Sequence, residues 1–136
     1  MQNLKEREEV IEFSKKLNTT NLSPLRSGNI SVRGLQDNVE GFFITPSGKK
    51  YESLKPEDIV FFFFFEDKDF LSWFNSGKNP SSEWRFHQDI YKNKWEAKAI
   101  VHAHSPNATA VSTHGKSIPS FHYMVALAGG EDIKCS

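Results

Sequence analysis

The spacing of apolar positions near the start of the chain predicts an amphipathic helix. Four residues fall on one face of a helical wheel: Val10, Phe13, Ser14 and Leu17. Charged residues lie between them, which is typical of a helix that packs one face on a core. The polar segment 18–24 ends this helix. Segments 30–33 and 41–45 then read as short strands, and the turn between them predicts a hairpin.

The most apolar stretch, residues 59–65, consists of isoleucine, valine and five consecutive phenylalanines. A continuous apolar run of this length predicts a strand that is covered on both faces. Residues 66–80 form a polar connection. After it, Ser81 or Ser82 is expected to cap a helix that runs to about Asn93.

The rest of the chain alternates between extended and helical segments. We expect a strand over 99–104, a helix over 107–113, an extended segment over 118–123 and a turn over 128–132. Strands and helices are therefore interleaved, and the chain contains no internal repeats or linkers. This organisation predicts a single domain over 1–136, of the α/β or α+β class, built on a central sheet.

Composition narrows the range of partners. The chain has 17 basic and 17 acidic residues, so it lacks the basic excess expected of a protein that binds nucleic acid or a membrane surface. No apolar run approaches the roughly 18 residues that a membrane-spanning helix needs. The first residues contain no hydrophobic signal core, and the single cysteine, Cys135, has no internal disulfide partner. We therefore expect a cytoplasmic location.

The sharpest local signal for chemistry is the sequence His102-Ala103-His104. Side chains two residues apart on a strand point to the same face, so two imidazoles in this arrangement can share one zinc ion. The pair ends an apolar strand, and Ser105-Pro106 begins a helix directly after it, a common location for sites in α/β folds. The alternative interpretation is one core histidine beside one solvated histidine.

A second candidate site lies at the start of the helix predicted after residue 80. Ser81 and Ser82 would present hydroxyl groups beside free backbone N–H groups, an arrangement suited to binding an anion. Glu83 and His87 are four residues apart on one helix face, where they form either a support pair for a site or a surface contact. The alternative interpretation is an ordinary capped helix, because the helix dipole alone favours Glu83 in the first turn.

Two glycine-containing turns complete the candidate chemistry. Segments 27–31, Ser-Gly-Asn-Ile-Ser, and 45–48, Thr-Pro-Ser-Gly, are small and polar. Turns of this kind can wrap an oxyanion with backbone N–H groups. Either turn taken alone is equally compatible with a plain hairpin or loop turn.

These pieces occur together, and in this order, in one known family. From about residue 4 to its end, the chain resembles the class II aldolase/adducin family. The motifs that carry the resemblance are Gly28-Asn29-Ile30-Ser31, Thr45-Pro46-Ser47-Gly48, Ser81-Ser82-Glu83 and His102-Ala103-His104. Segments 82–87 and 117–124 look most similar to L-fuculose-phosphate aldolases. The resemblance implies an α/β fold with a central mixed or antiparallel sheet flanked by helices.

The family also implies roles for the matching residues. His102 and His104 would be zinc ligands, and Glu83 would be the acid/base that can approach the metal. Tyr123 would reach the active site of a neighbouring subunit in a symmetric homo-tetramer. Five residues would hold the phosphate of a phosphorylated sugar: Asn29, Ser47, Gly48, Ser81 and Ser82. The implied reaction is the reversible cleavage of a ketose 1-phosphate, such as L-fuculose 1-phosphate, into dihydroxyacetone phosphate and an aldehyde.

Family members with other activities define the alternative functions. Sugar-phosphate 4-epimerases typically carry aspartate at the position of Glu83, and adducin-type relatives lose this carboxylate and have a structural role. Glu83 together with both histidines therefore favours a lyase. Dehydratases that act on methylthioribulose phosphate also carry glutamate and stay an alternative. A non-catalytic, adducin-like oligomerisation module or a degenerate fragment is the other alternative.

One feature of the family is not matched. Members usually supply a third histidine ligand from a later strand, and neither His114 nor His122 corresponds to it. We therefore expect a domain truncated at its C-terminus, with a bare sheet edge and exposed apolar surface. Two histidines and Glu83 would still hold zinc as a His₂Glu site, more weakly than three histidines do in the family. Our hypothesis is that the fold and a partial site persist while aldolase turnover is low or absent.

Overall fold

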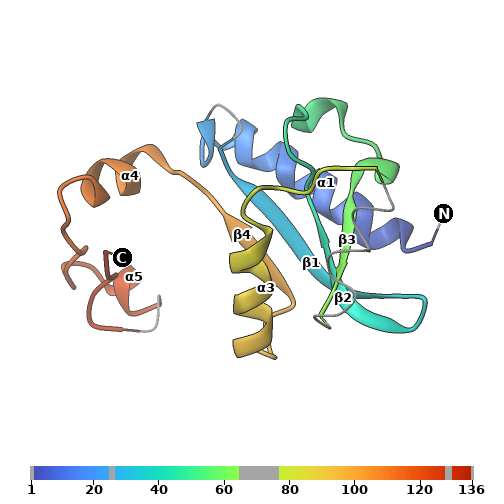
Figure 1. Ribbon diagram of the computed structural model, residues 1–136. Helices are drawn as coiled ribbons and strands as arrows, with labels where there is room; N and C mark the ends of the chain where they lie inside the picture. The colour runs from blue at the N-terminus through green and yellow to red at the C-terminus, as the bar shows by residue number, and fades with distance from the viewer. Residues whose placement is uncertain (1, 25–26, 65–76, 128–129, 136) are drawn as a thin grey trace.

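The computed structural model is built around a four-stranded antiparallel sheet (Figure 1). It describes residues 2–24, 27–64, 77–127 and 130–135. The strand order is β3–β2–β1–β4, and the strands are β1 (Asn29–Gln36), β2 (Val39–Ile44), β3 (Val60–Phe63) and β4 (Ala99–His102). The predicted hairpin of β1 and β2 is confirmed. Its turn residues, Asp37 and Asn38, have positive φ angles, which aspartate and asparagine tolerate better than most residues.

Helices cover both faces of this sheet. Helix α1 (Leu4–Thr19) packs on one face, next to the 3₁₀ turns η2 (Tyr51–Ser53) and η3 (Pro56–Asp58). Helix α3 (Trp84–Asn93) packs on the other face. The predicted fold class, an α/β domain with a central antiparallel sheet flanked by helices, is confirmed.

The phenylalanine run supplies alternate side chains to the two faces of the sheet. Phe61 and Phe63 pack in the cluster under α1, whereas Phe62 and Phe64 pack in the cluster under α3. Successive side chains of a strand point to opposite faces, so the prediction of a strand covered on both faces is confirmed. Phe65 and most of the predicted connection 66–80 lie outside the described residues.

The buried face of α1 differs from the predicted face at one position. Phe13 is 47% exposed, and Ile11 is buried in its place. Ile11 joins the cluster that the segment 51–59 contributes to, so this segment covers the Ile11 side of the helix. The Phe13 ring lies under the Lys16 ammonium, 4.5 Å from ring centroid to nitrogen, and so gains a cation–π contact in place of burial.

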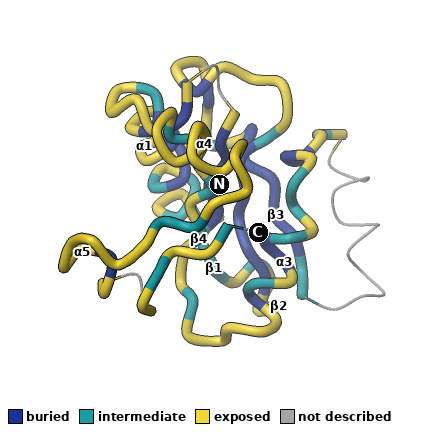
Figure 2. Tube along the Cα trace, turned by 90° about the vertical axis from the view of Figure 1, so that its left-hand side faces the viewer, coloured by how far each residue is buried: buried dark blue, intermediate teal, exposed yellow. Residues whose placement is uncertain are grey.

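After β4 the chain leaves the sheet and continues as a C-terminal arm, residues 103–135 (Figure 1). The arm contains α4 (Pro106–Ser112) and α5 (Tyr123–Ala126). Figure 2 shows that it is exposed along nearly its whole length, and Val125 is the one buried residue among those described in it. Three of its apolar side chains are more than 70% exposed: Phe121, Tyr123 and Leu127.

The predicted elements of the arm are only partly found. The helix predicted over 107–113 is confirmed as α4. The extended segment predicted over 118–123 is wrong at its end, because Tyr123 begins α5 and the His122 side chain caps that helix. The turn predicted over 128–132 lies partly outside the described residues. No helix in the described part of the chain is long and apolar enough to cross a membrane.

Candidate active site

Backbone hydrogen bonds tie together three loops that the sequence singled out. The N–H of Ser81 donates to the Thr45 carbonyl, and the N–H of Ser47 donates to the Asn79 carbonyl, both over 2.9 Å. The N–H of Thr45 in turn donates to the Ile30 carbonyl over 3.1 Å. The turn after β2 therefore lies between β1 and the loop that leads into α3.

Two glycines permit this close arrangement. A Cβ atom at Gly28 would lie 2.4 Å from the backbone oxygen of His102, so only glycine lets the turn before β1 approach β4 this closely. Gly48 has a φ of 77°, a left-handed conformation that residues with a side chain adopt at a cost. Both glycines are thus required by the backbone, whatever the cavity beside them binds.

A polar cavity of about 360 Å³ opens between these turns. All five residues predicted to hold a phosphate line it: Asn29, Ser47, Gly48, Ser81 and Ser82. Glu83 and His104 also line the cavity. The chain therefore brings its anion-binding and metal-binding candidates to one place, while their roles stay predictions.

Helix α3 begins later than the sequence predicts. Its first residue is Trp84, and Glu83 occupies the N-cap position without a side-chain cap hydrogen bond. The prediction that Ser81 or Ser82 caps the helix is therefore wrong. The Ser81 hydroxyl oxygen instead accepts a hydrogen bond from the Glu83 backbone N–H over 3.4 Å. Because Glu83 precedes the first helical turn, its carboxylate can turn toward β4.

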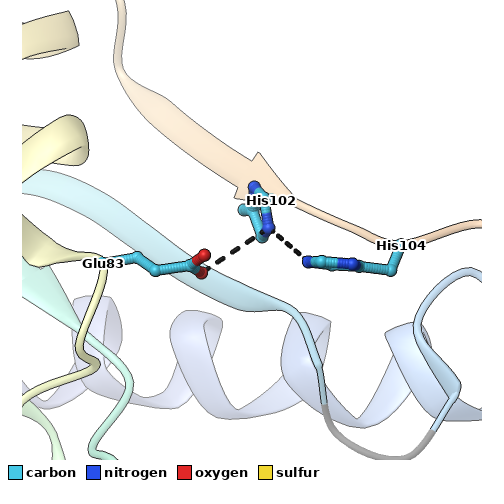
Figure 3. Close-up of side chains that lie close together, drawn as sticks. All are labelled: Glu83, His102 and His104. Carbon is cyan, nitrogen blue, oxygen red and sulfur yellow. Dashed lines mark hydrogen bonds and ion pairs between the residues drawn. The ribbon is translucent and has the colours of Figure 1, made fainter. Parts of the chain in front are cut away.

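Three candidate metal ligands converge where β4 ends. Glu83, His102 and His104 each offer one ligand atom, and these atoms lie within 4.8 Å of one another. Figure 3 shows His102 between the other two side chains: its Nε2 is 3.5 Å from a Glu83 carboxylate oxygen and 2.7 Å from the His104 Nε2. Among the described residues, no second group of three such ligands has this geometry.

The two histidines meet in a different way from the one predicted. Strand β4 ends at His102, so His104 is not part of the strand and does not share one strand face with it. The two rings nevertheless make an edge-to-face contact with centroids 4.7 Å apart. Neither histidine is buried, which argues against the alternative in which one of them belongs to the core.

The Glu83 carboxylate is joined to the protein core through Asn29. The Asn29 amide N–H donates to Glu83, and its carbonyl oxygen faces Nε2 of His87. His87 is fully buried. Burial lowers its pKa to about 4, and repulsion from His102 adds to that effect. Glu83 and His87 are therefore linked through a third residue, and the interpretation of this pair as a surface contact is wrong.

Two buried hydroxyl groups extend this network and were missed in the sequence. The Ser31 hydroxyl lies 2.7 Å from Nδ1 of His87 and 2.9 Å from the Tyr91 hydroxyl. Burial raises the pKa of Tyr91 to about 12, so Tyr91 keeps its proton. The spacing contains a signal for this network: His87 and Tyr91 are four residues apart on α3, and Asn29 and Ser31 are two apart on β1.

Lys49 and Tyr51 line the cavity as well, and the sequence did not single them out. Lys49 Nζ is 2.5 Å from a carboxylate oxygen of Asp58. Burial alone would raise the pKa of Asp58, but hydrogen bonds from Lys49 and a backbone N–H, together with nearby positive charge, hold it below its usual value. The place of Lys49 directly after the 45–48 turn is the signal that identifies it.

Tyr123 lies outside this cluster. It is on α5, is 74% exposed and packs its ring against His122, with centroids 4.4 Å apart. It lines a separate surface cavity together with Phe121 and His122. A single chain does not bring Tyr123 into the cavity that Glu83 lines, and a role in a neighbouring subunit stays a prediction.

Comparison with known proteins identifies the family. Residues 8–136 match the family model described as "Class II Aldolase and Adducin N-terminal domain". The chain belongs to the class II aldolase and adducin family. The resemblance predicted from the four motifs is thereby confirmed.

Several aldolases of this family are similar to the chain. It is 41% identical over 125 residues to a 5-methylthioribulose-1-phosphate/5-deoxyribulose-1-phosphate aldolase of Rhodospirillum rubrum, covering 92% of this chain and 52% of that protein. It is also 41% identical over 128 residues to an L-fuculose phosphate aldolase of Escherichia coli K12, covering 94% and 55% respectively. A solved L-fuculose 1-phosphate aldolase matches with a TM-score of 0.76 and 31% identity, covering 96% of this chain and 57% of that one.

The chain thus spans about half the length of the class II aldolases that it matches. The similarity establishes the family and the fold of this half. Which activity, substrate and partners the whole protein has is a matter for proposal.

Proposed function

We propose that this chain is the part of a zinc-dependent aldolase that carries the phosphate site and most of the metal site. The proposal rests on the convergence of Glu83, His102 and His104 beside a polar cavity lined by the five candidate phosphate-binding residues. The reaction would be the reversible cleavage of a ketose 1-phosphate into dihydroxyacetone phosphate and an aldehyde. When this reaction is metal-dependent, it needs a metal ligand set and an anion-binding site side by side.

The three side chains fit zinc. Zinc takes imidazole nitrogens and carboxylate oxygens at about 2.0–2.2 Å, so neighbouring ligands of a tetrahedral site lie roughly 3.3 Å apart. The two Nε2 atoms of His102 and His104 are separated by 2.7 Å, and His102 and Glu83 by 3.5 Å. These separations lie on either side of the tetrahedral value. A His₂Glu set of this kind leaves the fourth position open for substrate.

When bound, zinc would polarise the oxygens of the sugar and stabilise the negative charge that develops during cleavage. Cleavage removes the proton of the C4 hydroxyl, breaks the C3–C4 bond and adds a proton to C3. Glu83 would transfer the proton from the C4 hydroxyl to C3, because its carboxylate borders both His102 and the cavity.

The phosphate group would bind in the cavity between the turns. The hydroxyls of Ser47, Ser81 and Ser82 and the backbone N–H of Gly48 supply hydrogen-bond donors there. Lys49 also lines the cavity, where its ammonium is paired with Asp58. A phosphate group bound in this cavity would orient the sugar and would contribute binding energy away from the reacting carbons.

The relatives narrow the choice of sugar. Their names give L-fuculose phosphate in two cases and 5-methylthioribulose 1-phosphate or 5-deoxyribulose 1-phosphate in the other. All three relatives are named as aldolases. We therefore propose a ketose 1-phosphate of this group as substrate and favour an aldolase over the dehydratase and epimerase alternatives.

A homo-oligomer is also proposed, with the tetramer of the family as the expected form. The support is the apolar surface of the arm, where Phe121, Tyr123 and Leu127 are each more than 70% exposed, since surfaces of this kind mark association sites. Light scattering of the purified protein measures its assembly. A mass equal to one chain at micromolar concentration would contradict the oligomer.

Zinc content and aldolase turnover test the function together. The metal-replete wild type should hold about one zinc per chain and release dihydroxyacetone phosphate, at low turnover, from L-fuculose 1-phosphate or 5-deoxyribulose 1-phosphate. Coupling to glycerol-3-phosphate dehydrogenase and NADH measures that product. His102→Ala should lose both properties, because it removes the middle ligand. His114→Ala is the matched control, since His114 lies in the arm outside the ligand cluster.

A non-catalytic oligomerisation module would give a different result. Such a protein would assemble normally, hold no zinc and be indifferent to chelators and to His102→Ala. If the protein bound zinc but released no product, the proposed metal site would stand and the proposed aldolase activity would be wrong.

A further inference from the structure

A continuous line of hydrogen bonds runs from the core under α3 to the carboxylate of Glu83. In order, its members are Tyr91, Ser31, His87, Asn29 and Glu83. The first four are at most 4% exposed, and only the last two members, Asn29 and Glu83, line the cavity. The line is therefore closed to solvent at one end and open to the candidate active site at the other.

Two regular spacings generate this line. Glu83, His87 and Tyr91 follow one another at intervals of four residues at the start of α3 and along one side of it. Asn29 and Ser31 are two residues apart on β1 and project toward the same helix. Polar side chains from one face of α3 and one face of β1 thus interlock in a region that is otherwise packed with aromatic rings.

The chemistry of the side chains fixes the direction of every bond. Glu83 accepts from the Asn29 amide N–H, so the Asn29 carbonyl oxygen is the atom that faces His87. A carbonyl oxygen only accepts, and therefore Nε2 of His87 must carry its proton.

The remaining members follow the same direction. A neutral imidazole that is protonated at Nε2 is an acceptor at Nδ1, so the Ser31 hydroxyl donates to it. The Ser31 oxygen then accepts from the Tyr91 hydroxyl. All four donors point toward Glu83, and aligned hydrogen bonds in a region of low dielectric constant strengthen one another.

We propose that His87 is a positioning residue for Glu83, which it orients through Asn29 so that the carboxylate faces the metal ligands and the substrate. This inference rests on the proposed function and adds to it a residue outside the cavity. His87 acts by donating from Nε2, which locks the Asn29 amide with its N–H toward Glu83. Without that donor the amide loses its fixed orientation, and the carboxylate loses its link to the core.

A purely structural role for His87 makes a different prediction. A histidine that only fills the core would affect the stability of the fold, while zinc affinity in the folded protein would not change. It would also not require one particular ring nitrogen to be protonated. The tautomer and the zinc affinity therefore separate the two roles.

The first measurement uses the metal-free protein at neutral pH. Long-range ¹H–¹⁵N NMR correlations of the imidazole distinguish protonated from unprotonated ring nitrogens. We expect His87 as the neutral tautomer with its proton on Nε2, and His87→Gln identifies the signals by their disappearance. A proton on Nδ1, or on both nitrogens, would overturn the proposal.

The second measurement is zinc affinity by competition with a chromophoric chelator. His87→Phe keeps the ring but removes the donor, and we expect zinc to bind 10- to 100-fold more weakly, the usual effect of losing a partner that orients a metal ligand. His87→Gln should recover most of the affinity, because its amide N–H can donate to Asn29 while its carbonyl oxygen accepts from Ser31.

Phe62→Leu is the matched control for stability. Phe62 is fully buried under α3 and stacks on Trp84, but it has no part in the hydrogen-bonded line. This variant should lower the melting temperature and leave zinc affinity unchanged. If His87→Phe does not fold, Tyr91→Phe removes only the most distant donor, and we expect a loss of affinity of about 2- to 5-fold.

The outcomes separate this inference from the proposed function. Equal zinc affinity in wild type and in folded His87→Phe or Tyr91→Phe would overturn the role of His87 and leave the aldolase proposal intact. Normal zinc binding that weakens in His87→Phe, without any aldolase turnover, would overturn the aldolase and leave the role of His87 intact. A wild type that binds no zinc would overturn both.

Discussion

In the sheet body, residues 2–102, strands and helices bury apolar side chains on both faces of the sheet, and Phe42, Phe43 and Phe62 are completely inaccessible. In the arm, residues 103–135, the chain forms two short helices, and Val125 is its one buried residue among those described. The body therefore contains its own core. The described part of the arm has no core of its own, so its stability depends on the surface against which it packs.

The candidate site lies at the boundary between these two regions. The body supplies every lining residue of the cavity except His104, and it orients Glu83 through a buried network. His102 is the last residue of β4, and His104 is in the first residues of the arm. Phosphate binding should therefore tolerate changes in the arm, whereas metal binding should respond to changes in either region.

The largest expected difference between the two regions is in packing. Phe42→Ala removes a buried ring that stacks on Phe62 and contacts the Tyr91 ring at a tilt, and it should lower the free energy of unfolding by about 3–5 kcal/mol. Phe121→Ala removes a ring that is 75% exposed, and its effect should stay within about 0.5 kcal/mol. Urea unfolding at low protein concentration measures both. Equal losses would show that the arm has a packed core in solution.

The next largest effect concerns pH and the buried network of the body. The pKa of His87 is lowered from 6.5 to about 4 by folding, so between these values the unfolded chain binds a proton that the folded chain does not. The stability conferred by neutral His87 is complete above pH 6.5 and is lost as the pH falls toward 4. The loss should be on the order of 3 kcal/mol.

Unfolding of metal-free protein at pH 7, 5.5 and 4.5 measures this dependence. His87→Gln cannot titrate at this position, so its free energy of unfolding should fall less steeply over the same range. Parallel curves for the two proteins would mean that His87 takes up a proton without cost in the folded state. That result would contradict the closed, apolar setting of the network.

The main elements of the body could be predicted from the sequence, for identifiable reasons. The short, continuous run of phenylalanines is typical of a strand covered on both faces, because a strand with one face in solvent would alternate apolar and polar residues. The motifs of the two turns and of residues 81–83 and 102–104 mark backbone and side-chain requirements that are local in the chain. The resemblance to the family implied that these separate motifs meet at one site, and the structure brings them to one cavity and one ligand cluster.

Features that depend on contacts between distant segments were not predicted. Ile11 replaces Phe13 in the core because segment 51–59 packs along that side of α1, and nothing in the helical pattern contains that information. Ser31 and His87 are 56 residues apart, so their pairing needs the fold. Tyr123 was expected at the end of an extended segment, whereas the His122 side chain caps a helix that begins at Tyr123.

The smallest expected difference lies in two ion pairs, one in each region. In the body, Lys49 and Asp58 are 2.5 Å apart, and their side chains are 52% and 11% exposed. In the arm, Lys134 and Asp132 are 2.9 Å apart, and their side chains are 80% and 30% exposed. A hydrogen bond to a buried charged group contributes about 1–3 kcal/mol, whereas an exposed pair contributes about 0–1 kcal/mol.

Asp58→Asn should therefore destabilise the protein by about 1–3 kcal/mol at pH 6, and Asp132→Asn should have almost no effect. The pKa of Asp58 is lowered on folding from 3.8. Its contribution is thus present above that value and is lost as the pH falls through the folded-state pKa. The gap between wild type and Asp58→Asn should narrow between pH 6 and pH 3, while the curve of Asp132→Asn should follow that of the wild type throughout. A gap of the same size for Asp132→Asn would mean that the arm shields its charges as the body does, through contacts made by assembly.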